Sequence, residues 1–98
     1  MNVIVTDEVY NRLAEIKKYI AKDSVQNANK VVDKILASFE NIGIFPNSGT
    51  HLSNRIDCSN DLKYKIVYSY AVIYKIEGNN VVIATVLHLK RDFNRIKF

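Results

Sequence analysis

The chain has 98 residues, of which 48% are hydrophobic and 24% are charged, and its net charge is +4. This length leaves room for one domain, residues 1–98, with one modest core. The small excess of lysine and arginine favours an acidic protein partner or a nucleic acid without choosing between them. A single cysteine, Cys58, excludes an internal disulfide and a cysteine-cluster metal site.

The first two elements are predicted to be a strand and a helix. Asn2–Val5 is short and rich in β-branched residues, which indicates an edge strand. Thr6 or Asp7 is suited to cap a helix that starts directly afterwards. Spacings of four, three and four residues then place one apolar stripe on that helix. The stripe consists of Val9, Leu13, Ile16 and Ile20.

A second helix follows after a short interruption. Asp23 and Ser24 end the first helix and offer a new N-cap. Gly43 is predicted to form a left-handed C-cap, and Pro46 prevents the helix from resuming. So short a connection makes the two helices an antiparallel hairpin. The second stripe spans fewer than three heptads, so packing on the domain's own sheet is favoured over a coiled-coil dimer seam. Its members are Val25, Ala28, Val32, Ile35, Phe39 and Ile42.

The stretch Leu62–Asp92 is predicted to form three antiparallel strands that end in a basic tip. Residues 70–77 alternate with the two-residue period of a strand, and Gly78-Asn79-Asn80 supplies a tight turn. Residues 81–87 are apolar except for Thr85, so this strand is covered on both faces, or on one face with the other awaiting a partner. Pro46–Asp61 is predicted to be one long loop. The order indicates an α+β fold: an N-terminal strand, a helical hairpin and a three-stranded antiparallel sheet.

The sequence gives no sign of a cofactor, a metal or a membrane segment. Its two histidines have no suitably spaced partner for a metal site. The N-terminus lacks the cationic start and long apolar run of a signal peptide, and no apolar run is long enough to cross a bilayer. We therefore expect a cytoplasmic protein without a cofactor.

Four segments, in this order and over nearly the whole chain, resemble the RelE/ParE superfamily of toxins from type II toxin–antitoxin modules. They are YIAKDS at Tyr19–Ser24, the Pro-x-x-Gly loop of Pro46 and Gly49, the pattern of Tyr70, Tyr74 and Ile76, and VLHLKRD at Val86–Asp92. The resemblance implies a compact toxin silenced by a cognate antitoxin, as a homodimer or as a toxin–antitoxin hetero-oligomer. An apolar sheet face on a basic body suits an acidic amphipathic segment of that antitoxin.

The superfamily has two branches with different targets. ParE-like members bind and block DNA gyrase, whereas RelE-like members cleave mRNA on the ribosome. The VLHLKRD ending is closer to the ParE pattern, and no tyrosine follows Tyr74 to serve as a late acid or base. The resemblance therefore favours gyrase inhibition over mRNA cleavage, and an inactive relative that acts as a binding module is a third alternative.

Which residues form the candidate site depends on whether the chain acts as a RelE-like nuclease or as a ParE-like gyrase inhibitor. In a nuclease, His88 would act as acid or base, because its ordinary pKa is about 6.5, and Arg91 would hold the phosphate. The alternative for His88, which we favour, is a strand-end imidazole bonded to the backbone or in contact with the antitoxin. Candidate RNA- or target-binding residues are His51, Arg55, Lys63, Lys65, Lys90 and Arg95. Candidate antitoxin-binding residues on the sheet are Tyr70, Tyr74, Val82 and Val86.

Overall fold

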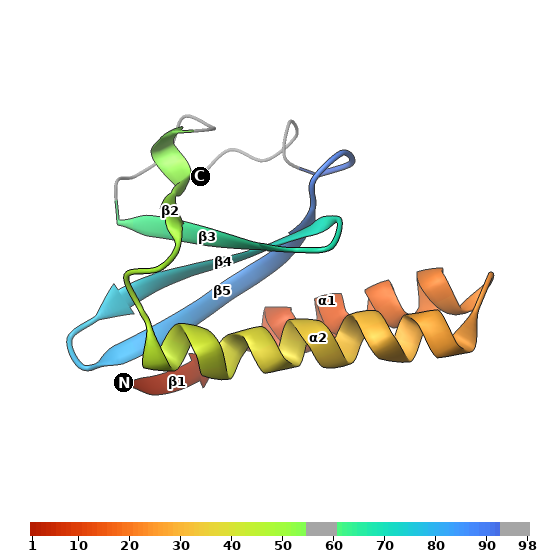
Figure 1. The fold of residues 1–98 in the computed structure, drawn as a ribbon, viewed down its shortest axis with the longest axis horizontal. Helices are drawn as coiled ribbons and strands as arrows, with labels where there is room; N and C mark the ends of the chain where they lie inside the picture. The colour runs from red at the N-terminus through yellow and green to blue at the C-terminus, as the bar shows by residue number, and fades with distance from the viewer. Residues whose placement is uncertain (55–60, 93–98) are drawn as a thin grey trace.

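The computed structural model describes residues 1–54 and 61–92, which form two layers (Figure 1). An antiparallel helical hairpin covers one face of a five-stranded sheet. In chain order the elements are β1 (Asn2–Val5), α1 (Asp7–Ala21), α2 (Val25–Ile44), β2 (Thr50–His51), a 3₁₀ turn (Leu52–Asn54), β3 (Leu62–Val67), β4 (Tyr70–Glu77) and β5 (Asn80–His88). The predicted α+β fold is confirmed.

The sheet is mixed, with strand order β1-β5-β4-β3-β2. Strands β3, β4 and β5 form the predicted antiparallel unit, and β1 lies at the edge as predicted, parallel to β5. The prediction of one uninterrupted loop over Pro46–Asp61 is wrong, because Thr50–His51 pair with β3 and a 3₁₀ turn follows. Two residues are too few for a two-residue period to be visible in a sequence.

The helix ends are partly as predicted. The Ser24 hydroxyl accepts a hydrogen bond from the Asn27 N–H at 3.1 Å, so the predicted cap of α2 is confirmed. The prediction for Gly43 is wrong, because α2 continues through Gly43 to Ile44 without a left-handed residue. A methyl group on Gly43 would lie 2.6 Å from Cγ2 of Val3. Glycine therefore lets β1 approach the helix closely at this point.

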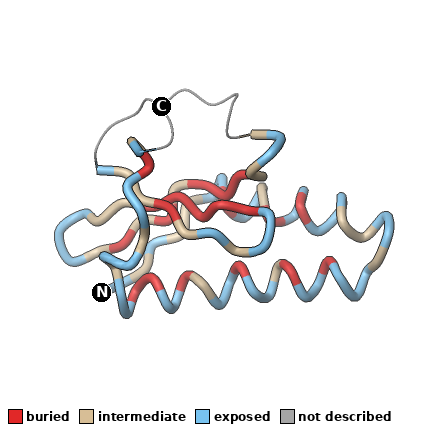
Figure 2. Tube along the Cα trace, turned by 45° about the horizontal axis from the view of Figure 1, so that its top comes forward, coloured by how far each residue is buried: buried red, intermediate tan, exposed pale blue. Residues whose placement is uncertain are grey.

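Buried residues are concentrated in the central strands and alternate with exposed residues along the helices (Figure 2). They form two apolar cores, one on each face of the sheet. The larger core joins the helical stripes to the facing side of β4 and β5, and includes Val9, Leu13, Ile35, Phe39, Val72 and Ile83. The opposite face holds a smaller core of Leu52, Tyr64, Ala71, Ile73 and Leu87. Of the two alternatives predicted for the strand over residues 81–87, coverage on both faces is therefore the one that the structure shows, because the residues of both cores are buried.

A β-bulge in β5 shifts which residues face the helices. Ile73 pairs with Thr85 and Tyr74 pairs with Ile83, so Ala84 has no partner on β4. The extra residue places Ile83 and Val86 in the same helix-facing core despite their odd spacing. The Thr6 hydroxyl, at the start of α1, donates to the Ala84 carbonyl at 3.1 Å. This bond ties the bulge to the start of the first helix, and the bulge itself decides which side chains at the end of β5 face the helices.

Candidate functional site

The C-terminal end of β5 closes into a tight turn at His88. The His88 carbonyl accepts from the Asp92 N–H at 2.9 Å, and the His88 N–H donates to Oδ2 of Asp92 at 2.8 Å. The Leu89 N–H donates to the Ser69 carbonyl at 2.9 Å, which fastens the turn to the β3–β4 connection. Residues 88–92, called the His88 turn below, are therefore held at both ends.

The imidazole of His88 is a hydrogen-bond acceptor for its own turn. Its Nδ1 accepts from the backbone N–H groups of Lys90 and Arg91, each at 3.2 Å. An accepting Nδ1 requires the neutral ring to carry its proton on Nε2. Burial of the ring, together with the charges of Arg91 and Lys90, lowers the pKa of His88, while Asp92 acts in the opposite direction. The ring is therefore neutral at pH 7 and stabilises the turn.

Helix α1 forms the other wall of a small cavity of about 110 Å³ at this turn. The Arg91 guanidinium carbon lies 4.4 Å from the centre of the Tyr19 ring, a cation–π distance. Tyr70 meets the His88 ring edge to face, with centroids 5.2 Å apart. Burial raises the pKa of Tyr70, and Arg91 opposes that shift. The cavity is lined by Arg12, Glu15, Ile16, Tyr19, Tyr70, Val86, His88, Arg91 and Asp92.

The family is decided by comparison with known proteins. A family model described as the ParE toxin of the type II toxin–antitoxin system parDE matches residues 3–93.

The chain belongs to the ParE toxin family.

A solved structure titled as the chromosomal ParDE toxin–antitoxin system from P. aeruginosa has the same fold, with a TM-score of 0.75 and 14% sequence identity. The alignment covers 92% of this chain and 97% of that one. No curated protein sequence matches the chain.

The positively charged candidates of this ParE-family chain do not form one cluster. Lys90 and Arg91 lie in the His88 turn, but neither Lys63 nor Lys65 lines the cavity beside it. Lys65 instead reaches α2, where its Nζ donates to Oδ1 of Asn41 at 3.3 Å. His51 pairs with Lys63 at the β2 edge of the sheet. Arg55 and Arg95 lie outside the described residues.

The predicted antitoxin-binding residues are largely inaccessible in this ParE-family fold. Tyr70, Tyr74 and Val86 are buried in the core between the helices and the sheet. Only Val82 is partly exposed. The sequence showed these residues to be apolar and on a strand, but the helical hairpin already covers three of them.

Residues of α1 in the site were missed by sequence reasoning. Arg12, Glu15 and Tyr19 line the same cavity as the His88 turn, from the side of the helix. Their spacings of three and four residues place them on one helix face beside the apolar stripe, which is the signal that identifies them.

No helix among residues 1–54 and 61–92 is long and apolar enough to cross a membrane. The same residues contain no group of three or more possible metal ligands placed to bind an ion.

Proposed function

We propose that this chain is a growth-inhibiting toxin that binds DNA gyrase through its His88 turn and is neutralised by a cognate antitoxin. Membership of the ParE toxin family supports the type of toxin. The observation that carries the mode of action is the position of His88. Its Nδ1 is engaged by two backbone N–H groups, so the ring serves the architecture of the turn.

Acid–base chemistry has little support at this cavity. Cleavage of RNA by its 2′-hydroxyl needs a group to take that proton and another to protonate the leaving oxygen. The free lone pair of the His88 ring is used by the turn, so it does not take that proton, and a raised pKa leaves the Tyr70 hydroxyl no better placed to act as a base. Asp92 already accepts the His88 N–H. These contacts favour protein binding over catalysis.

The same geometry suits recognition of an acidic protein surface. The turn presents Arg91 beside Tyr19, which is 53% exposed. Arginine and tyrosine are the residues that most often dominate binding energy at protein interfaces, because they combine apolar area with directed polar groups. Lys90 is exposed next to them. The bonds of the turn to Asp92 and Ser69 hold the backbone of Lys90 and Arg91 in place before a target arrives.

Induced expression in a bacterial host tests this proposal. Plasmid supercoiling, the DNA-damage response and the integrity of mRNA are measured within minutes of induction. The proposal predicts an early DNA-damage response with mRNA intact. Arg91→Ala should reduce the response, whereas Lys75→Ala, a charge removed from the far part of β4, should leave it unchanged. Each variant is compared by thermal unfolding to exclude loss of the fold.

Two outcomes would contradict gyrase inhibition. Rapid cleavage of mRNA before any DNA damage would identify a ribosome-dependent endonuclease instead, and His88→Ala would then be the next variant. Normal growth with the folded chain present at high level would identify a binding module without toxicity.

A further inference from the structure

The tip of the helical hairpin projects beyond the end of the sheet (Figure 1). A concave surface of about 300 Å³, called the overhang notch below, lies between the hairpin and the end of the sheet. The hairpin side of the notch includes Ile20 and Asn27, and the sheet side includes Tyr68, Ser69 and His88. Among the described residues, no aspartate or glutamate lines it. The notch therefore offers neutral polar groups without a carboxylate that would repel an anion.

Positively charged side chains lie on both sides of the notch, each against a tyrosine ring. Lys22, the C-cap of α1, places its Nζ 5.8 Å from the centre of the Tyr19 ring, and Arg91 lies 4.4 Å from the same centre. On the other side, Lys30 of α2 places its Nζ 6.0 Å from the centre of the Tyr68 ring. These are cation–π distances. The two rings therefore hold three cations around one concave surface.

The cations and the rings are accessible to a ligand. Tyr19 is 53% exposed and Tyr68 is 49% exposed. Within residues 1–54 and 61–92, the ion pair is that of Lys75 with Glu77, at the far end of β4, so none of the three cations is paired with a carboxylate. An anion that reaches the notch does not have to displace an internal partner.

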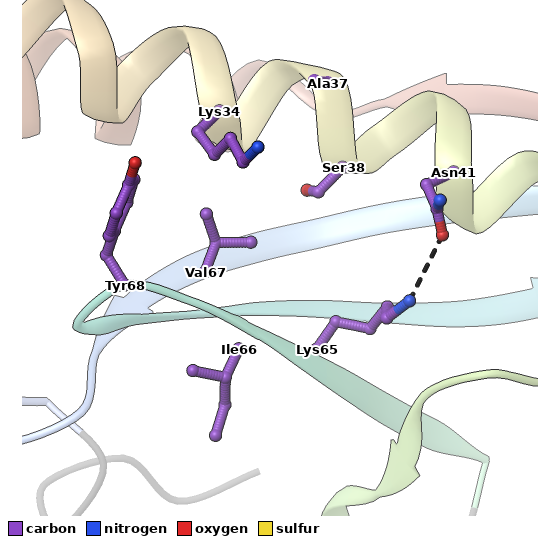
Figure 3. A pocket seen from close by; sticks show the side chains of 8 residues that line it. All are labelled: Lys34, Ala37, Ser38, Asn41, Lys65, Ile66, Val67 and Tyr68. Carbon is purple, nitrogen blue, oxygen red and sulfur yellow. Dashed lines mark hydrogen bonds between the residues drawn. The ribbon is translucent and has the colours of Figure 1, made fainter.

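Tyr68 adopts a backbone conformation that is uncommon for a bulky residue. Its φ of +53° is in the left-handed region. Figure 3 shows its side chain directed from the β3–β4 connection toward α2, beside Lys34. Lys34 follows Lys30 by one helical turn, so two lysines of α2 lie near this ring. Strained residues of this kind are concentrated at binding sites.

These groups are the ones that contact the backbone of nucleic acids. Phosphate oxygens are bound by arginine and lysine and by the polar groups of serine, asparagine and tyrosine. A DNA duplex carries one phosphate charge for about every 1.7 Å of its axis, so several phosphates face the cations from Lys22 to Lys30 at once. The notch also adjoins the proposed gyrase contact, because His88 lines both the notch and the small cavity at Arg91. It is therefore placed to reach the DNA on which that enzyme acts.

We propose that the overhang notch binds the phosphate backbone of a DNA duplex through Lys22, Lys30 and Arg91, so that the toxin holds gyrase and its DNA at the same time. The inference rests on the proposed function, because gyrase brings the duplex to this surface. Tyr19 and Tyr68 hold the cationic side chains and offer their hydroxyl groups to phosphate oxygens. Contacts to the backbone alone carry no preference for a base sequence.

Binding of the purified chain to a short labelled DNA duplex tests the site without gyrase. Fluorescence anisotropy is measured over a range of salt concentrations. Three phosphate contacts predict that the logarithm of the binding constant falls against that of the salt concentration with a slope of about −3. Lys22→Gln/Lys30→Gln should reduce the slope to about −1 and weaken binding about tenfold or more. Thermal unfolding verifies that the variant is folded.

The matched control removes the same charge at the opposite end of the sheet. Lys63 and Lys75 lie where β3 begins and β4 ends, away from Tyr68. Lys63→Gln/Lys75→Gln should keep both the affinity and the slope of the unaltered chain. Equal losses in the two double variants would mean that DNA responds to net charge alone, which overturns the site.

Further outcomes separate this inference from the proposed function. An unaltered chain that does not bind the duplex, or that binds an RNA duplex more tightly, overturns the DNA site. Inhibition of gyrase by a chain that does not bind DNA keeps the proposed function and removes the notch from it. If the chain binds the duplex with the predicted slope but leaves gyrase unaffected, the proposed function fails while the DNA site stands.

Discussion

Tyr74 and Gly49 form a contact that joins the centre of the sheet to the loop after α2. The Tyr74 hydroxyl accepts from the Gly49 N–H and donates to the Pro46 carbonyl, each at 2.9 Å. Tyr74 is fully buried, and a methyl group on Gly49 would collide with its phenol ring. The Pro-x-x-Gly pattern and Tyr74, separate in sequence, are therefore one structural unit.

Removing the Tyr74 hydroxyl should destabilise the fold. Tyr74→Phe leaves the Gly49 N–H and the Pro46 carbonyl without their partner, which costs about 1–3 kcal/mol. Urea unfolding measures this loss. Tyr10→Phe, at an exposed position of α1, is the matched control and should have no effect. Equal stability of Tyr74→Phe and the unaltered chain would show that these bonds contribute nothing.

The buried hydroxyl of Thr85 should be dispensable. Thr85 is buried on β5, and its Oγ1 has no hydrogen-bond partner among the described residues. An unsatisfied buried hydroxyl is unfavourable, so Thr85→Val, which keeps the β-branched shape, should stabilise the fold by roughly 1 kcal/mol. The free energy of unfolding in urea gives the result. A clear loss of stability in Thr85→Val would mean that the hydroxyl makes a bond that matters.

Alanine at Gly43 should destabilise the chain although it favours helices. In an ordinary helix interior, glycine to alanine gains about 1 kcal/mol. Here the added methyl group would meet Cγ2 of Val3 at 2.6 Å, so β1 or α2 has to move. Thermal unfolding should give a lower midpoint for Gly43→Ala. Adding Val3→Ala should recover part of the loss, whereas independent, additive effects would contradict the contact.

The stability of the turn should depend on the protonation of His88. Because its folded-state pKa is below the ordinary value of 6.5, the unfolded chain binds the proton more readily. The stabilisation is complete above pH 6.5 and is lost as the pH falls from there through the folded-state pKa. Nitrogen chemical shifts should show the Nε2–H tautomer at pH 7. His88→Asn keeps an acceptor side chain and should weaken this pH dependence, and an Nδ1–H tautomer would contradict the account.

Sequence patterns predicted the positions of the helices and strands better than they predicted which face of the sheet each side chain occupies. The tyrosines at 64, 68, 70 and 74 have the same parity, but Tyr64 pairs with Ile73 and belongs to the opposite core from Tyr70 and Tyr74. The register of β3 against β4 depends on the connection at Tyr68-Ser69, where a tyrosine adopts the left-handed conformation. Sequence rules expect glycine or asparagine there, so this register was not predictable.

The candidate site was only partly predictable, because several of its side chains come together through packing between elements that are distant in sequence. The VLHLKRD ending identified His88 and Arg91 as neighbours, since they are close in sequence. The cavity that they share with Tyr19 and Glu15 depends on how α1 lies across the end of β5, where the Thr6 hydroxyl bonds to Ala84 at the bulge. Long-range packing of this kind leaves no periodic signal in the chain.

Supercoiling of relaxed plasmid DNA by purified gyrase, with and without the purified chain, tests the central claim most directly. The account predicts that the chain stops supercoiling, that Arg91→Ala requires about ten times more protein for the same effect, and that Lys75→Ala behaves as the unaltered chain. Supercoiling that proceeds normally in an excess of the folded chain, while ribosome-bound mRNA is cut in a parallel reaction, would contradict it.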